Sequence, residues 1–188
     1  VKRVNNREKY ETIESDRLFN NLLSSQPMAF NLFCPLRNMS SEIATKVIKA
    51  ALPDYPIYKV TEIELEFIPE KHMELTGDKS AMDAIIRFED ECGKEGFIAV
   101  ETKYSENLGT NAVYVKDENG KKMPRLQSIN AIRELQCFNP ITEKGIMEGK
   151  IPLTQIYRNF LLSEMYGLRG RDEKLESYSI ILAPKRLH

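Results

Sequence analysis

The sequence has few of the residues that mark secreted, zinc-binding or membrane-spanning proteins. Its 188 residues include three cysteines, two histidines and no tryptophan. Cys34, Cys92 and Cys137 form no CxxC pair, so neither a disulfide framework nor a zinc site is indicated, and a reducing cytoplasm is the simplest compartment. No apolar run approaches the ~20 residues of a membrane-spanning helix, so we expect no membrane partner. The start, VKRVNNREKY, lacks the apolar core of a signal peptide.

Charge of one sign is also missing. Lys and Arg total 27 and Asp and Glu total 28, for a formal net charge of −1. This balance disfavours a protein that binds polyanions through a basic tail, but it leaves a nucleic-acid enzyme open, because local charge placement matters more than the sum. The length predicts one domain over residues 1–188. Because the first residue is Val rather than Met, we expect the chain to be trimmed.

Hydrophobic periodicity predicts a mixed α/β chain with the element order α-α-β-β-β-α-α-β. Helices are expected over residues 7–24, 40–52, 124–138 and 152–168. Strands are expected over residues 58–68, 81–88, 96–104 and 177–183. Gln26-Pro27 is expected to break the first helix, and residues 69–79 and 105–123 are expected to be polar loops.

The middle strands differ in how many of their faces are apolar. Glu62, Glu64 and Glu66 alternate with apolar residues, which is typical of a strand with one wet face. Residues 81–88 and 96–104 are apolar on both faces, so we expect them near the centre of the sheet. The fold class is therefore a mixed β-sheet flanked by α-helices.

Asp83, Glu101 and Lys103 form the most informative constellation. An antiparallel hairpin turning near Cys92-Gly93 would place Asp83 opposite Glu101, about 5 Å apart between Cβ atoms. Glu101 and Lys103 share a face because side chains in a strand repeat every two residues. The simpler alternatives are that Asp83 caps a turn and that Glu101 and Lys103 form an ordinary exposed pair.

Two neighbouring carboxylates in a partly buried sheet raise each other's pKa unless a cation lies between them. An oxygen-only pair such as Asp83 and Glu101 suits Mg²⁺ or Mn²⁺, and the carbonyl of Thr102 would supply a third oxygen. A metal of this kind lowers the pKa of a bound water. Lys103 would then orient the nucleophile or hold a phosphate oxygen.

These residues resemble the PD-(D/E)XK nuclease superfamily, whose members have a restriction-endonuclease-like fold. Asp83 takes the place of the first acid of the motif, and Glu101-Thr102-Lys103 matches its (D/E)-x-K part. Ala81-Met82 stands where the motif's name has proline. The segments SSQPMAFNLF, GDKSAMDA, GFIAVETKY and QIYRNFLL extend the resemblance over roughly residues 24–165.

The resemblance implies a Mg²⁺-dependent nuclease that hydrolyses DNA phosphodiester bonds. Gln155 matches a helical glutamine of many relatives that orders the metal-bound water, and Arg158, one turn later, would grip a backbone phosphate. Some relatives carry one more acid; Glu42, Glu66 and Gln26 are the candidate positions, with Glu66 preferred. A homodimer is an expectation from the resemblance, because cutting both strands usually takes two active sites.

Basic residues follow the Glu101-Thr102-Lys103 strand and are candidates for a phosphate track. They are Lys116, Lys121, Lys122, Arg125 and Arg133. The alternative for them is a solvated loop and helix start. The alternative for the whole chain is a catalytically silent nuclease-fold module that binds nucleic acid or a protein partner.

Overall fold

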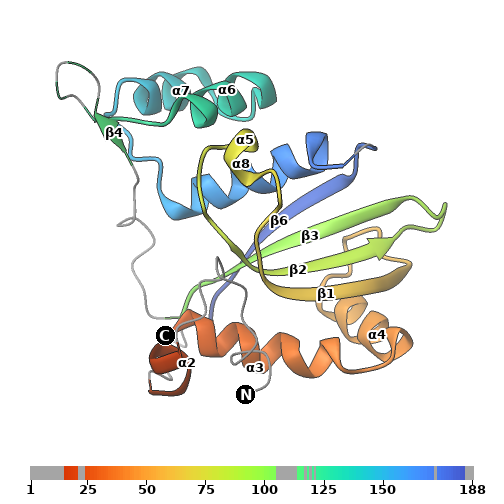
Figure 1. Ribbon diagram of the computed structural model, residues 1–188. Helices are drawn as coiled ribbons and strands as arrows, with labels where there is room; N and C mark the ends of the chain where they lie inside the picture. The colour runs from red at the N-terminus through yellow and green to blue at the C-terminus, as the bar shows by residue number, and fades with distance from the viewer. Residues whose placement is uncertain are drawn as a thin grey trace. The chain divides into compact units, whose positions relative to one another are not determined.

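A computed structural model of the chain describes residues 15–20, 24–104, 114–116, 118, 120, 122–171 and 173–184 (Figure 1). The chain forms two compact units, each assembled from separate stretches of sequence. The first unit comprises Val1–Phe67, Ala81–Glu106 and Leu175–His188, and the second comprises Ile68–Ser80 and Asn107–Lys174. The organisation as one domain over residues 1–188 stays a prediction.

The first unit is built on a four-stranded sheet with the strand order β1-β2-β3-β6. Its strands are β1 (Lys59–Phe67), β2 (Met82–Glu89), β3 (Glu95–Thr102) and β6 (Glu176–Leu182). The strand β2 runs antiparallel to both β1 and β3, and β6 runs parallel to β3. The mixed sheet and its helices are those of a restriction-endonuclease-like α/β fold, and β2 and β3 are its central strands, as predicted.

Helices α3 (Ser25–Arg37) and α4 (Ser41–Ala51) lie along one face of this sheet (Figure 1). The helix α4 begins as predicted, with the Ser40 hydroxyl accepting a hydrogen bond from the Ile43 amide at 3.4 Å. Gln26 and Pro27, which were expected to break the first helix, lie in the first turn of a separate helix, α3, whose N-cap is Ser24. Pro27 lies in the first turn, where its missing N–H would have had no helical partner.

The remaining predicted N-terminal helix is only partly described. The structure contains α2 (Ser15–Asn20) inside the predicted range 7–24, and residues 7–14 and 21–23 lie outside the described residues. Leu18 on α2 is buried in the core of the first unit.

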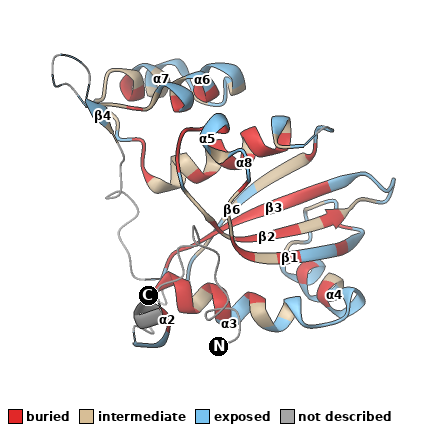
Figure 2. Ribbon diagram, viewed as in Figure 1, coloured by how far each residue is buried: buried red, intermediate tan, exposed pale blue. Residues whose placement is uncertain are grey.

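The core of the first unit lies between the sheet and the two helices α3 and α4. Figure 2 shows the central strands almost entirely buried. Apolar residues from β1, β2 and β3 face Phe30 and Phe33 of α3 and Ile48 of α4. They are Val60, Ile63, Leu65, Ala84, Ile86, Phe88, Ile98 and Val100. Burial of this apolar surface is the main favourable term that holds the sheet against the helices.

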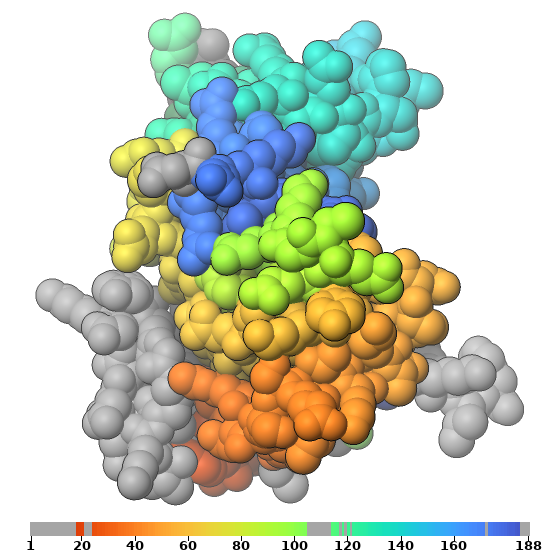
Figure 3. Space-filling view, turned by 90° about the vertical axis from the view of Figure 1, so that its right-hand side faces the viewer, coloured from red at the N-terminus to blue at the C-terminus, as the bar shows by residue number. Residues whose placement is uncertain are grey.

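A tight turn joins β2 to β3 and lies at the surface in Figure 3. The Asp90 carboxylate accepts hydrogen bonds from the amides of Cys92 and Lys94, both at 2.8 Å. Gly93 has a φ of +76°, a left-handed conformation that glycine adopts without steric cost. The turn therefore sits where the sequence predicted it.

The second unit is largely helical. Its elements are α5 (His72–Leu75), β4 (Val115–Lys116), β5 (Lys122–Met123), α6 (Leu126–Leu135), α7 (Pro140–Met147) and α8 (Gln155–Arg169). Four buried residues form a core here: Ile132, Ile146, Leu153 and Leu161.

Several elements of the second unit differ from the sequence-based expectation. A four-residue helix, α5, interrupts the expected loop 69–79, and β4 and β5 form a short hairpin within the expected loop 105–123. The helix α7 was missed, although Asn139 caps it and Pro140 begins it. Leu126, at the start of α6, is 66% exposed. In the part of the chain described here, no helix has the length and apolar character needed to cross a membrane.

We predict that Ile98→Ala lowers the free energy of unfolding by about 2–5 kcal/mol, because Ile98 is fully buried in β3 and its loss leaves a cavity. The matched control is Ile181→Ala on the edge strand β6, where the side chain is 51% exposed and the loss should stay within about 0.5 kcal/mol. Urea denaturation measures both. Equal losses would contradict the burial pattern described for the sheet.

Candidate functional site

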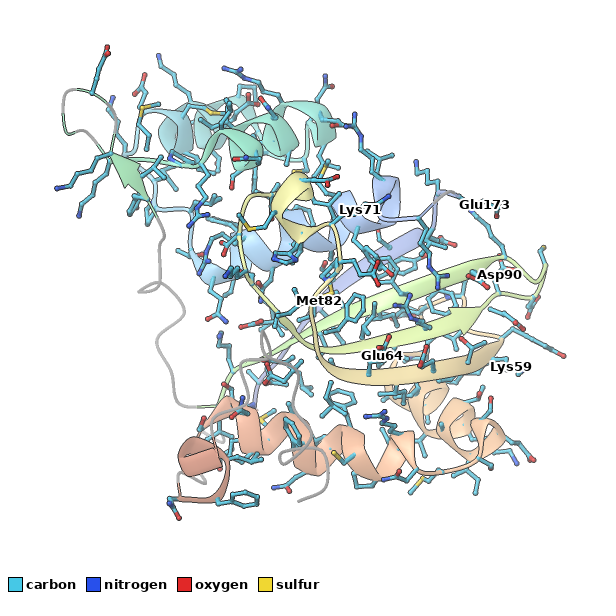
Figure 4. All side chains as sticks on the ribbon, viewed as in Figure 1. Lys59, Glu64, Lys71, Met82, Asp90 and Glu173 are labelled. Atoms are coloured by element: carbon cyan, nitrogen blue, oxygen red, sulfur yellow. The ribbon has the colours of Figure 1, made fainter. Side chains whose placement is uncertain are left out.

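The register of β2 and β3 brings the predicted acidic residues together. The pairing runs from Glu89 opposite Glu95 to Ala84 opposite Val100 without a break. Continued by one residue, still inside both strands, this register would set Asp83 opposite Glu101. Figure 4 labels Met82 at the start of β2 and Asp90 at the turn, so the candidate residues lie at the Met82 end of the hairpin.

Asp83 is held by Thr102 of the neighbouring strand. Its Oδ2 accepts a hydrogen bond from the Thr102 amide and another from the Thr102 hydroxyl, each at 2.6 Å. The hydroxyl also lies 3.1 Å from the carbonyl oxygen of Ser25 in α3. A hydroxyl carries one hydrogen and donates to one acceptor at a time, and the shorter contact and the negative charge favour Asp83. Thr102 thus fixes the direction of the carboxylate.

Glu101 and Lys103 form a buried ion pair. Lys103 Nζ lies 2.5 Å from Glu101 Oε1, and the two side chains are only 9% and 6% exposed. Their shared face follows from the period of the strand, as the sequence predicted. The simple alternative of an exposed surface pair is therefore wrong. Removing both charges from water costs several kcal/mol, so the pair is not expected to add much to the stability of the fold. Buried charges of this kind are common at functional sites.

Glu66 is a third acid at the same level of the sheet. In the pairing of β1 with β2, Leu65 lies opposite Ala84 and Phe67 opposite Met82, which places Glu66 across from Asp83. The side chain of Gln26 in α3 donates a hydrogen bond to Glu66 Oε1 at 2.8 Å, and both residues are more than nine-tenths buried. Glu66, Asp83 and Glu101 therefore occupy neighbouring positions along three adjacent strands, and the Glu66 side chain is bound by α3.

The burial of Glu66 departs from the wet face predicted for β1. Glu62 and Glu64 follow that prediction and pair with Arg87 at 3.6 and 3.2 Å. Glu66 has a φ of 51°, a left-handed conformation that is uncommon for any residue except glycine. This conformation breaks the alternation, so that Leu65 and Glu66 are both buried. The periodicity of the sequence contains no signal for this change.

The donor set suits a hard divalent cation. The residues that the sequence suggested as ligands offer only oxygens: the carboxylates of Asp83 and Glu101 and the carbonyl of Thr102. Mg²⁺ typically binds one or two protein carboxylates and keeps several waters, so this set fits its chemistry. Within the described residues no group of three or more His, Cys, Asp or Glu side chains gathers as a metal cage. A cation held here would therefore be bound by the two carboxylates, the carbonyl oxygen of Thr102 and water.

The other predicted site residues belong to the second unit. Gln155 is the first residue of α8, directly after its N-cap Thr154. Arg158, one turn later, forms an ion pair with the Asp78 carboxylate and a hydrogen bond to the Ser80 hydroxyl at 3.1 Å. The side chain of Arg158 is 10% exposed. Its position is thus defined by contacts inside the protein that the sequence did not suggest.

The predicted basic residues that the structure describes are of two kinds: some contact other groups of the protein, and others are exposed to solvent. Arg125 precedes α6 and donates a hydrogen bond to the carbonyl oxygen of Gly77. Lys122 lies exposed on β5. Arg133 lies exposed in the last turn of α6. Lys121 lies outside the described residues.

Comparison with known proteins gives one match. A family model described as the PD-(D/E)XK nuclease superfamily matches residues 1–187, nearly the whole chain. The search of curated proteins and the search of solved structures found no match.

We predict that Thr102→Val lowers the free energy of unfolding by about 1–3 kcal/mol, because it removes the hydroxyl that donates to the Asp83 carboxylate. The control is Thr102→Ser, which keeps the hydroxyl and loses one methyl group. Chemical denaturation at neutral pH measures both variants. If the serine variant loses as much stability as the valine variant, packing of the methyl group and not the hydrogen bond holds this position.

Proposed function

The chain belongs to the PD-(D/E)XK nuclease superfamily, and from this premise we propose that it is a metal-dependent endonuclease that hydrolyses DNA phosphodiester bonds. The proposal is supported by the hydrogen bonds that hold the Asp83 carboxylate against Thr102 of β3 and by the buried ion pair, 2.5 Å long, between Glu101 and Lys103 on either side of Thr102. The match to the superfamily supports nuclease chemistry at a coarse level. The substrate, the metal and the individual roles are our proposal.

Asp83 and Glu101 are proposed to bind Mg²⁺ or Mn²⁺ together with the carbonyl oxygen of Thr102. When bound, the cation would supply Lewis acidity and a water of lowered pKa. Thr102 has a second task, because its amide and hydroxyl hold Asp83 in one orientation. This preorganisation means that the carboxylate need not be ordered when the cation binds.

Lys103 is proposed to interact with the substrate rather than to stabilise the fold. Its ammonium group is held beside Glu101 in a nearly water-free position, where a charge interacts strongly with a neighbouring phosphate oxygen or with the attacking water. An ammonium group there stabilises the negative charge that develops on the phosphate during in-line attack.

Gln155 and the basic residues are proposed to take part in the same reaction, as the resemblance to the superfamily implies. Gln155 would order the attacking water, as the resemblance to relatives implies. Arg158 and Arg125 would support phosphate binding, and a homodimer would supply two active sites for cutting both strands. For the two arginines, the contacts to Asp78 and Gly77 favour an indirect contribution through the segment that they hold.

We predict that Asp83→Asn and Lys103→Met each slow the cleavage of supercoiled plasmid in Mg²⁺ by about 100-fold or more, because each removes a charge that the reaction uses. The matched control is Glu62→Gln, an exposed carboxylate on β1, which should cleave at the parental rate. Circular dichroism checks that the variants are folded. Parental cleavage by either site variant would refute the assignment.

We predict that calorimetry with Mn²⁺ in the absence of DNA detects binding that Asp83→Asn weakens by about tenfold or more, since one of two carboxylate ligands is lost. Chelation of divalent ions should stop plasmid cleavage, and added Mg²⁺ should restore it. Folded protein that binds DNA but neither binds Mn²⁺ nor cleaves would favour the alternative of a catalytically silent nuclease-fold module.

A further inference from the structure

The hairpin of β4 and β5 places two like charges directly across from each other. Its pairing sets Lys116 opposite Lys122 and Val115 opposite Met123. Both lysines are exposed. Directly opposed like charges destabilise a two-stranded pair, and a hairpin this short has little stability of its own. The lysine pair therefore opposes the folding of the element that carries it.

Neither lysine has a carboxylate partner among the described residues. Other exposed lysines of the second unit do: Lys144 and Lys150 lie 3.9 and 2.5 Å from Glu148. The contact described for Lys122 is with an aromatic ring, because its Nζ lies 5.8 Å from the centre of the Tyr114 ring. Such a contact orders the side chain, and the ring itself carries no negative charge that would neutralise the ammonium group.

The backbone of the hairpin is packed tightly from behind. Gly149, which follows α7, has a φ of +70°, and a Cβ atom at this position would come within 2.7 Å of the carbonyl oxygen of Lys122. Only glycine allows this approach. The close packing holds β5 against the end of α7, so that the hairpin presents its lysines from a defined backbone.

Unlike the two hairpin lysines, Arg125 and Arg158 of the same unit contact other groups of the protein. Arg125 donates to the carbonyl of Gly77, and Arg158 pairs with Asp78 with only about a tenth of each side chain exposed. Ser128 also binds this segment, through a 2.8 Å hydrogen bond from its hydroxyl to the carbonyl of Thr76. These contacts order residues 76–80, whereas Lys116 and Lys122 of the hairpin are exposed.

We propose that the β4–β5 hairpin binds the DNA backbone, with Lys116 and Lys122 each contacting a phosphate. Adjacent phosphates of one strand form a row of negative charges, and a pair of neighbouring ammonium groups is complementary to such a row. The unfavourable contact between the lysines is relieved when a phosphate lies beside them. This inference rests on the proposed function and names the surface that holds its substrate.

The test measures how the affinity for a short fluorescent DNA duplex depends on salt, without divalent ions so that no cleavage occurs. The affinity falls as salt rises, and each lost phosphate contact reduces the magnitude of the slope of log K against log salt by about one. Lys116→Gln combined with Lys122→Gln should therefore lower the slope by about two. The matched control combines Lys144→Gln with Lys150→Gln, which removes two exposed lysines of the same unit and should leave the slope unchanged.

A second variant is expected to change the stability of the hairpin and its affinity for DNA in opposite directions, which distinguishes a binding role from a structural one. Lys116→Glu places opposite charges across the hairpin, so amide hydrogen exchange of Lys122 and Met123 should slow. The same change should weaken DNA binding at low salt, because a repulsive charge replaces a contact. A merely structural role for Lys116 would move stability and affinity in the same direction.

The outcomes distinguish this inference from the proposed function. A wild-type protein that cleaves plasmid, combined with an unchanged slope in the hairpin variant, overturns the inference alone. A control variant that lowers the slope as much as the hairpin variant overturns it too, because the attraction is then unspecific. Hairpin-dependent binding to vesicles of anionic lipid, with DNA affinity unaffected by the hairpin variant, also overturns it. Failure of the wild type to bind or cleave DNA refutes both.

Discussion

The register between β2 and β3 is the constraint on which the candidate site depends. A slip of one residue would turn Asp83 to the other face of the sheet and separate it from Glu101. Interactions at both ends prevent this slip. At one end the Asp90 carboxylate and Gly93 set the turn, and at the other end Thr102 binds Asp83 twice. The buried residues between them, such as Ile86 and Ile98, would lose their places in the core if the register changed.

Polar residues accumulate at the Met82 end of the sheet at a cost to stability. Glu66, Glu101 and Lys103 are buried charged groups, and Glu66 adopts a left-handed backbone conformation. Backbone conformations of this kind persist where the surrounding structure holds them, and they concentrate at functional sites. The first turn of α3 provides the support here, because the side chain of Gln26 donates a hydrogen bond to Glu66. The placement of a helix end against the strand ends thus explains why the polar residues can be buried together.

The basic residues of the second unit differ in their contacts: two arginines bind other groups of the protein, whereas the lysines of the hairpin are exposed. A planar guanidinium group suits fixed contacts with a carboxylate or a carbonyl, and Arg125 and Arg158 make such contacts with residues 77–80. Lysine is a compact and strongly hydrated charge, and Lys116 and Lys122 lie exposed on the hairpin. A count of basic residues along the sequence treats the two kinds alike, whereas their contacts separate them.

Local patterns in the sequence were sufficient for the central strands, for their antiparallel register and for α4, because side-chain alternation and turn residues act over a few positions. Asn139 and Pro140 formed a comparable local signal for the start of α7, because asparagine is a common N-cap and proline a common first residue of a helix. The hydrophobic pattern did not predict this helix. Only the tertiary structure decided that Glu66 is buried by Gln26 and that Arg158 pairs with Asp78. These partners are 40 and 80 positions apart in the chain, and no periodicity encodes which distant side chain will meet a buried charge.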